Sequence, residues 1–301
     1  MTARPNFFIV GAAKAGTTSL ASYLGQHQDV FFPGVKEPKF LSAPENAFPH
    51  LGPGDDVADA RVVHGMEAYL ALFAPGAGAR ARGEASVDSL VFPGVPGRLC
   101  GLFPDARIIA ILRNPVDRAY SAWMHLVRDG RENLPFAEAL AQEQRRREAN
   151  WEFLWWYEHC GRYAEPLARF LETFGRERCK VVLFDQLKAD PEGLCRELFA
   201  FLGVDTGFTP DASRRLNVSG APKNRRLHDM FHTRNPLKAL VRPLLPRALR
   251  ERIRSRVDAA NMDRPRLAPE TRAALASRFD PDLASLEQLL DIDLGHWRNA
   301  T

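Results

Sequence analysis

The sequence lacks the features that mark membrane-spanning proteins, exported proteins and thiolate metal sites. Its apolar stretches are broken by charge or glycine well before the roughly 18 residues of a spanning helix, and the apolar segment at Phe7 runs into Lys14 rather than a cleavage site. The four cysteines have no C-x-x-C spacing: Cys100, Cys160, Cys179 and Cys195. We therefore expect a cytoplasmic protein with reduced thiols, no membrane span and no metal site.

Two common nucleotide-binding signatures are also missing. In the loop that binds nucleoside triphosphates, the lysine directly follows the last glycine, whereas Lys14 stands two residues before Gly16. No apolar strand ends in an aspartate suited to holding magnesium, and the dinucleotide fingerprint of three spaced glycines is absent. These absences disfavour ATP hydrolysis and dinucleotide binding.

Size and charge allow a large core and an anionic ligand. The 301 residues, 45% of them hydrophobic, are enough for a single domain over residues 1–301. The net charge of +4 suits an anionic ligand. Lysines and arginines are mostly dispersed rather than gathered in one tract, so we expect no nucleic-acid partner. The sequence does not indicate the oligomeric state.

Apolar runs typical of buried strands alternate with helical patterns, which predicts an α/β fold: a three-layer sandwich with a central parallel sheet flanked by helices. We expect strands at 7–11, 106–112 and 180–184, with shorter ones near Val30 and at 83–86. We expect helices at 162–174, ended by Gly175, at 191–202, between Asp190 and Gly203, and as a pair within 269–290. Residues 204–260 are expected to form an irregular excursion on the cofactor or acceptor side of the domain.

The first motif joins a buried strand to a helix through a loop of small residues. Residues 7–10 read as a strand covered on both faces, residues 11–16 allow close backbone approach to a ligand, and residues 17–19 open a helix. The unpaired amides and the dipole at that helix start favour a phosphate or sulfate, and Lys14 adds a full positive charge. The alternative is an ordinary strand-to-helix turn.

A second strand, charged turn and helix follow at residues 106–121. Asn114 suits the helix N-cap before a proline. Arg113 at the carboxyl end of the strand can fork onto a phosphate, and Ser121, about two turns into the helix, can donate to the same group. A structural arginine paired with Asp117 is the alternative. Ligands of open α/β sheets bind at the carboxyl ends of strands, so two such ends with anion donors favour the functional interpretation.

These residues resemble the sulfotransferases that use 3′-phosphoadenosine 5′-phosphosulfate (PAPS). Their 5′-phosphosulfate loop is similar to Lys14-Ala15-Gly16-Thr17-Thr18-Ser19, and their 3′-phosphate motif is similar to Arg113-Asn114-Pro115 with Arg118 and Ser121. Two segments of the heparan sulfate N- and 3-O-sulfotransferases are similar to Lys36-Glu37-Pro38-Lys39-Phe40 and Gly83-Glu84-Ala85-Ser86. The resemblance runs from Phe7 to Phe201, with a weaker match at 294–297. It implies a P-loop-like fold and metal-free transfer of a sulfuryl group from PAPS, with 3′-phosphoadenosine 5′-phosphate (PAP) as product.

The resemblance and the chemistry of sulfuryl transfer together suggest a role for each site residue. In-line transfer needs positioned reactants, charge stabilisation on the leaving 5′-phosphate and removal of the acceptor's proton. We assign Lys14 to the leaving phosphate, Ala15 through Ser19 to the phosphosulfate, and Arg113 with Ser121 to the 3′-phosphate. Glu37 is the expected general base. One of the two flanking lysines is expected to approach the transferring group, and Lys39 is favoured over Lys36. For this charged segment the alternative is a solvated turn.

The chain departs from the resemblance at two points. The mammalian glycan enzymes often carry lysine where this chain has Ala85, so an acceptor or donor contact made by that lysine is missing. Their carboxyl-side Lys-Gly-Arg loop has a loose counterpart at residues 222–226, where Lys223 and Arg225 are expected to contact the 3′-phosphate or adenine. A basic surface patch is the alternative.

The sequence leaves the acceptor open between a carbohydrate and a small metabolite, and between a hydroxyl and an amine. The aromatic residues within 151–157 either line an acceptor pocket or, as is commoner, belong to the core. His64, His125 and His159 are expected to be structural. The rival functions are a magnesium-dependent kinase and a non-catalytic module that binds PAP as a sensor.

Overall fold

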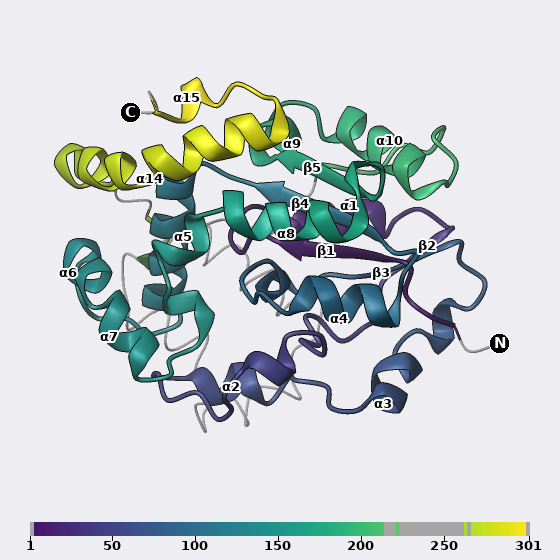
Figure 1. Cartoon of the computed structure of the whole chain (residues 1–301), viewed down its shortest axis with the longest axis horizontal. Coiled ribbons are helices and arrows are strands. Elements are labelled where there is room, and N and C mark those ends of the chain that lie inside the picture. Colours follow the sequence, from purple (N-terminus) through teal and green to yellow (C-terminus); the bar gives the residue numbers. More distant parts are fainter. Residues whose placement is uncertain (1–2, 214–220, 223–261, 264–265, 299–301) are drawn as a thin grey trace, which may run out of the picture.

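Five parallel strands form the central sheet of this chain, in the order β2-β3-β1-β4-β5 (Figure 1). The computed structural model describes residues 3–213, 221–222, 262–263 and 266–298. The strands are β1 (Phe7–Gly11), β2 (Val30–Phe31), β3 (Ala81–Glu84), β4 (Arg107–Leu112) and β5 (Cys179–Leu183). The predicted α/β class and all five predicted strands are therefore confirmed, with shifts of one to a few residues at their ends.

The central strands are apolar because helices cover them on both faces. Every residue of β1 is buried, and β4 is buried after Arg107. Phe7 pairs with Gly83 of β3 on one side and with Arg107 of β4 on the other. A Cβ atom at Gly83 would stand 2.0 Å from the Phe7 ring, so this pairing requires glycine.

Connections from the centre of the sheet run in opposite directions and build the two outer layers. The helix α1 (Thr17–Leu24) leads from β1 to β2, whereas α8 (Ala164–Phe174) lies between β4 and β5. Because parallel crossovers are right-handed, α1 and α8 cover opposite faces of the sheet. The helix α10 (Pro191–Leu202) packs beside α1, and α4 (Val95–Leu102) packs beside α8, which completes the three layers (Figure 1).

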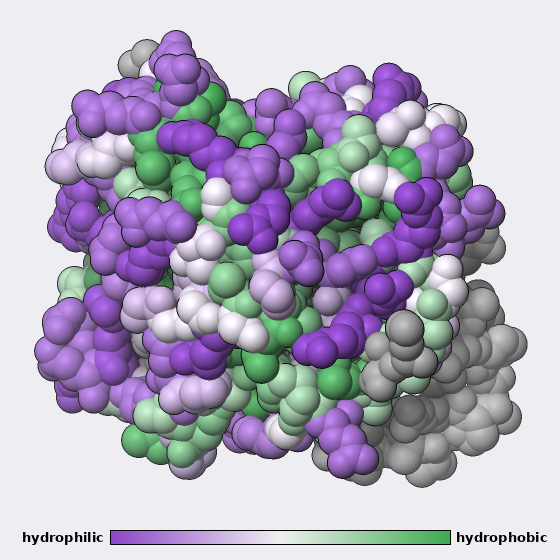
Figure 2. All heavy atoms as spheres, turned by 45° about the vertical axis from the view of Figure 1, so that its right-hand side comes forward, coloured by the Kyte–Doolittle hydropathy of each residue, from purple (hydrophilic) through white to green (hydrophobic). Residues whose placement is uncertain are grey.

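The remaining elements surround this sandwich. Their bounds are α2 (Asp55–Asp59), α3 (Met66–Ala71), α5 (Pro115–Arg128), α6 (Phe136–Ala141), α7 (Glu143–Glu148), α9 (Phe184–Ala189), α14 (Pro269–Leu290), α15 (Gly295–Arg298) and the short antiparallel pair β6 (Ala221–Pro222) and β7 (Met262–Asp263). Figure 2 shows hydrophilic and hydrophobic residues interleaved on the face that it presents. None of the described helices is long and apolar enough to cross a bilayer.

The capping residues and glycines in the sequence predicted the ends of α8 and α10 correctly. The side chain of Asp190 accepts from the amide of Gly193 at 2.8 Å and caps α10, and Gly203 follows its last turn with a left-handed φ of 73°. Gly175, with φ 79°, ends α8 as predicted.

The helix pair predicted within 269–290 is wrong, because this segment forms the single helix α14. Pro281 lies inside it, where a proline removes one backbone hydrogen bond. A stripe of buried side chains continues on both sides of the proline and holds the helix against α5 and α8: Leu275, Phe279, Leu283 and Leu286. Tertiary packing therefore outweighs the local cost of the proline.

The aromatic segment after α7 belongs to the core rather than to an open surface. Phe153, Trp155 and Tyr157 are almost inaccessible to solvent, and Trp151 and Trp156 pack against them partly buried. The core interpretation of this segment is confirmed. All four cysteines are free thiols. Lys223, Arg225 and most of the expected excursion at 204–260 lie outside the described residues.

Candidate active site

The two anchor motifs of the sequence meet at the carboxyl edge of the sheet. Strands β1 and β4 are neighbours, and the amide of Ala12 donates to the carbonyl of Ile111 at 2.7 Å where both strands end. The Nη1 atom of Arg113 donates to the backbone carbonyl of Lys14 at 3.1 Å. The loop after β1 and the turn after β4 are thus joined into one surface.

The loop after β1 leaves the start of α1 open. Lys14 and Gly16 both adopt left-handed backbone conformations, with φ 68° and φ 94°. Gly16 occupies the N-cap position, and no side chain caps the first amides of α1. A Cβ atom at Gly16 would stand 2.8 Å from the Phe184 ring, so glycine is needed for this turn. Uncapped amides at a helix start form a cradle for an anion.

Lys14 lies in a partly buried position among other cations. Burial, followed by the charge of Arg128, lowers the pKa of Lys14 to about 7, and Lys36 and Arg113 act in the same direction. Asp129 is the carboxylate that opposes them. This part of the site is therefore short of negative charge, and an anionic ligand would restore the usual protonation of Lys14.

Arg113 does not form the ion pair with Asp117 that the sequence offered as an alternative. Asp117 accepts instead from Nη2 of Arg272 at 2.6 Å. The guanidinium of Arg113 lies 5.1 Å from the centre of the Phe184 ring, and burial lowers its pKa. Asn114 caps α5 as predicted, since its Oδ1 accepts from the amide of Val116 at 3.0 Å.

One face of α5 runs from the second anchor toward Lys14. Ser121, His125 and Arg128 follow one another at helical spacings of four and three residues, and Ser121 is buried. Burial, then the charges of Lys14 and Arg128, lower the pKa of His125 to about 2, and Arg128 donates to its Nδ1. His125 is thus a neutral imidazole beside Lys14. It was considered structural from the sequence, although its spacing from Ser121 is a signal that places both on one face.

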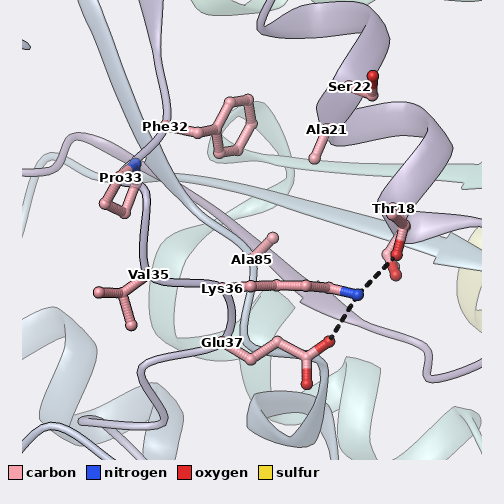
Figure 3. A pocket seen from close by; sticks show the side chains of 10 residues that line it. Thr18, Ala21, Ser22, Phe32, Pro33, Val35, Lys36, Glu37 and Ala85 are labelled. Carbon is pink, nitrogen blue, oxygen red and sulfur yellow. Dashed lines mark hydrogen bonds and ion pairs between the residues drawn. The ribbon is translucent and has the colours of Figure 1, made fainter. Parts of the chain in front are cut away.

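Glu37 and Lys36 approach the same loop from the segment after β2 (Figure 3). The Nζ atom of Lys36 donates to Thr18 Oγ1 at 3.1 Å and lies 3.9 Å from Glu37 Oε1. The side chain of Glu37 is 25% exposed, and burial raises its pKa. A carboxylate with a raised pKa therefore stands next to the loop after β1.

Lys39, which was expected near the transferring group, is engaged elsewhere. Its Nζ donates to Glu152 Oε1 at 2.8 Å and lies 5.1 Å from the centre of the Phe153 ring. Its side chain is only 8% exposed. Burial opposes the charge of Lys39, but Glu152 and Asp88 outweigh it and raise the pKa of Lys39. Of the two lysines, the structure brings Lys36 rather than Lys39 to the loop.

A buried polar network that the sequence did not reveal lies beneath Glu37. Glu152 accepts from Lys39 and, at 3.2 Å, from Arg131, while Asp88 accepts from the hydroxyl of Ser42 at 2.6 Å. Glu84 accepts from the hydroxyl of Tyr69, and burial raises the pKa of Glu84 to about 7. The charges of Asp88 and Glu152 act on Glu37 to raise its pKa further.

A pocket of about 230 Å³ adjoins this group of residues. It lies between α1, the segment after β2 and the end of β3. Its lining consists of Thr17, Thr18, Ala21, Ser22, Phe32, Pro33, Val35, Lys36, Glu37 and Ala85 (Figure 3). In the described part of the chain, no three His, Cys, Asp or Glu side chains gather in a way that could hold a metal ion.

Comparisons with known proteins agree on one family. A family profile described as "Sulfotransferase family" matches residues 95–210. The crystal structure of a sulfotransferase from Alicyclobacillus acidocaldarius is 40% identical, with a TM-score of 0.79 over 98% of this chain and 99% of that chain.

Curated relatives are more distant. Bifunctional heparan sulfate N-deacetylase/N-sulfotransferase 1 of Caenorhabditis elegans is 27% identical over 207 residues, 66% of this chain and 22% of that protein. Heparan sulfate glucosamine 3-O-sulfotransferase 6 of Mus musculus is 28% identical over 200 residues, 66% of this chain and 52% of that protein. The match thus spans about half or less of the length of these relatives.

A parallel sheet flanked by helices, with an anion cradle at its carboxyl edge, defines a P-loop-like α/β enzyme fold. Within that class the chain belongs to the sulfotransferase family, whose donor is PAPS and whose nucleotide product is PAP.

Proposed function

We propose that the chain transfers a sulfuryl group in line from PAPS to a hydroxyl, or an amine, of an acceptor, and that the whole chain acts as one sulfotransferase domain. The observation that carries the proposal is the convergence of four features on one edge of the sheet. These are the uncapped start of α1, Lys14, Arg113 and Glu37. The curated relatives are named for heparan sulfate, so a carbohydrate is one candidate acceptor class and a small metabolite is the other.

Donor binding is assigned to the two joined motifs. The amides and hydroxyls of residues 15–19 receive the 5′-phosphosulfate, and Arg113 with Ser121 receives the 3′-phosphate. Support comes from the contact between Arg113 and the carbonyl of Lys14, which ties the two groups of donors together. Lys223 and Arg225 are retained as proposed contacts to the 3′-phosphate or adenine.

Lys14 is assigned to the leaving group. As the bond between sulfur and the bridging oxygen breaks, negative charge grows on the 5′-phosphate, and a fixed cation in a partly buried site stabilises it. Neighbouring cations contribute to the lowered pKa of Lys14, which supports a site built to bind an anion. Lys36, which bonds Thr18, is assigned to the oxygens of the transferring sulfuryl group.

Glu37 is assigned to the acceptor. The acceptor oxygen forms a new bond to sulfur, its proton moves to the Glu37 carboxylate, and PAP departs with the electron pair of the broken bond. The raised pKa of Glu37 makes it a stronger base than an exposed glutamate. Lys39 is assigned to a positioning role, because its ion pair with Glu152 fixes the segment that carries Glu37.

Calorimetry with PAP, ATP and adenosine monophosphate, each with and without magnesium, tests the proposal. We expect PAP to bind more tightly than both other nucleotides, with the same affinity whether or not magnesium is present. Preference for ATP with magnesium would favour the kinase alternative. Tight binding of PAP without any transfer from PAPS to a broad acceptor panel would favour the sensor alternative.

A further inference from the structure

The pocket beside Glu37 lies on the opposite side of β1 from the residues assigned to the 3′-phosphate. Arg113 and Ser121 follow β4, which is one neighbour of β1 in the sheet. The pocket is lined instead from the segments after β2 and β3, on the other side, and from α1. A donor held between the loop after β1 and the turn after β4 therefore extends away from the pocket. Among the described residues, neither Arg113 nor Ser121 lines the pocket.

Charge in this pocket is concentrated at one end. Lys36 Nζ lies 3.1 Å from Thr18 Oγ1 and 3.9 Å from Glu37 Oε1, next to the proposed position of the sulfuryl group. In Figure 3 the alkyl chain of Lys36 runs past Ala85 toward Thr18. Thr17, Thr18 and Ser22 of α1 add hydroxyl groups, and the rest of the wall consists of small or apolar side chains: Ala21, Phe32, Pro33, Val35 and Ala85.

We propose that the acceptor is a small, uncharged and largely apolar alcohol or phenol. Its hydroxyl would face Glu37, and its apolar body would pack against Phe32, Val35 and Ala85. The volume of about 230 Å³ lies below the roughly 300–1,000 Å³ of sites for drug-sized ligands and suits a single substituted ring. This inference rests on the proposed function, since it takes Glu37 as the base.

A sulfated glycan matches the described lining poorly. Each sugar hydroxyl that leaves water requires a hydrogen-bond partner, and each sulfate requires a cation. The hydroxyls of Thr17, Thr18 and Ser22 all lie on α1, at one side of the pocket, and among the described lining residues Lys36 is the sole cation and already contacts Thr18 and Glu37. Ala85 presents a methyl group at the wall, which offers contact to carbon and none to charge.

Steady-state transfer from labelled PAPS tests the inference with three acceptors: para-cresol, cellobiose and a desulfated heparin oligosaccharide. We expect kcat/KM for para-cresol to exceed that for either saccharide by about tenfold or more. Sulfation of a saccharide with para-cresol unreacted would overturn the inference while leaving the proposed function intact. Failure of the wild-type chain to bind PAP in calorimetry would overturn both.

Two valines provide a matched pair of variants. Val35 lines the pocket and is 37% exposed, whereas Val57 lies on α2 outside the pocket and is 56% exposed. Val35→Lys should raise KM for para-cresol about tenfold or more, with the affinity for PAP unchanged, because it places a charge on the apolar wall. Val57→Lys should change neither quantity. Ala85→Lys, directly after β3, provides a second pocket variant with the same expectation for KM. Unchanged KM in both pocket variants would overturn the inference.

Discussion

Arg113 Nη1 donates to the backbone carbonyl of Lys14 at 3.1 Å, across a sequence separation of 99 residues. The two residues assigned to opposite ends of the donor are therefore in direct contact with each other. A change in Arg113 acts on the 3′-phosphate directly and on the phosphosulfate loop through the carbonyl of Lys14.

Replacement of Arg113 should separate these two effects. Arg113→Lys keeps the charge but loses the planar fork, so we expect PAP affinity to fall by about ten- to a hundredfold. The affinity for adenosine monophosphate, which lacks the 3′-phosphate, should fall much less in the same calorimetric experiment. Ser121→Ala is the matched control, because it removes one donor at the 3′-phosphate and leaves the loop contact of Arg113 in place. Equal losses for both nucleotides would reject the 3′-phosphate assignment.

Lys14 should stabilise the transition state of the reaction and lower the stability of the folded protein. Its pKa of about 7 lies below its usual value of 10.5, so the unfolded chain binds more protons between these two pH values. This loss of folding stability is fully present below pH 7 and disappears as the pH rises toward 10.5. We expect Lys14→Met to raise the melting temperature by about 2 °C at neutral pH and by less at higher pH. Its kcat should fall about a hundred- to thousandfold. A stability gain that grows with pH would contradict this account.

Glu37 should produce the acidic limb of the pH–rate profile. Because its pKa is raised above 4.5, kcat should fall as the pH decreases through that raised value. Glu37→Gln should lower kcat by about a hundred- to ten-thousandfold and abolish the limb, with PAP affinity within about twofold of wild type. If PAP binding collapses in this variant, Glu37 has a structural role and another base must be sought.

His125 should remain neutral across the physiological range. With a pKa of about 2, caused by burial and by the charges of Lys14 and Arg128, its ring nitrogens should keep the chemical shifts typical of a neutral imidazole between about pH 5 and pH 8. Arg128→Met removes one of these charges, so the pKa of His125 should rise in that variant. Two-dimensional NMR of the histidine side chains measures both. A titration of His125 near pH 6.5 in the wild-type protein would show that neither burial nor these cations lower its pKa.

The buried pair of Lys39 and Glu152 should be structural. Removing one member leaves an unpaired buried charge, so Glu152→Gln should lower the free energy of unfolding by about 3–5 kcal/mol. The double variant Lys39→Met with Glu152→Met should recover most of that loss in chemical denaturation. It should also retain a higher kcat than Lys36→Met, which removes the ammonium group beside Thr18. A lower kcat in the double variant than in Lys36→Met would instead assign Lys39 to the transferring group.

Local chemistry explains why much of the fold could be predicted. The apolar runs of β1 and β4, the cap at Asn114 and the glycine at 203 act over a few residues, so the sequence displays them directly. The proximity of Lys14 and Arg113 also follows from a local rule, because both stand at the carboxyl ends of parallel strands.

What could not be predicted depends on contacts that are distant in the sequence. Lys39 pairs with Glu152, 113 residues away, and nothing near Lys39 signals this partner. The continuation of α14 through Pro281 depends likewise on packing against α5 and α8. The electrostatic state of His125 depends on Lys14, which is remote in sequence and adjacent in space.

The order of the strands has a consequence for how this enzyme can change. The residues assigned to the donor follow β1 and β4, whereas the wall of the acceptor pocket comes largely from the segments after β2 and β3. Residues 32–35 contribute to the pocket wall but include none of the residues assigned to the donor or to proton removal. New acceptors can therefore be acquired, in evolution or by grafting residues 32–35, on a scaffold whose donor chemistry is inherited intact.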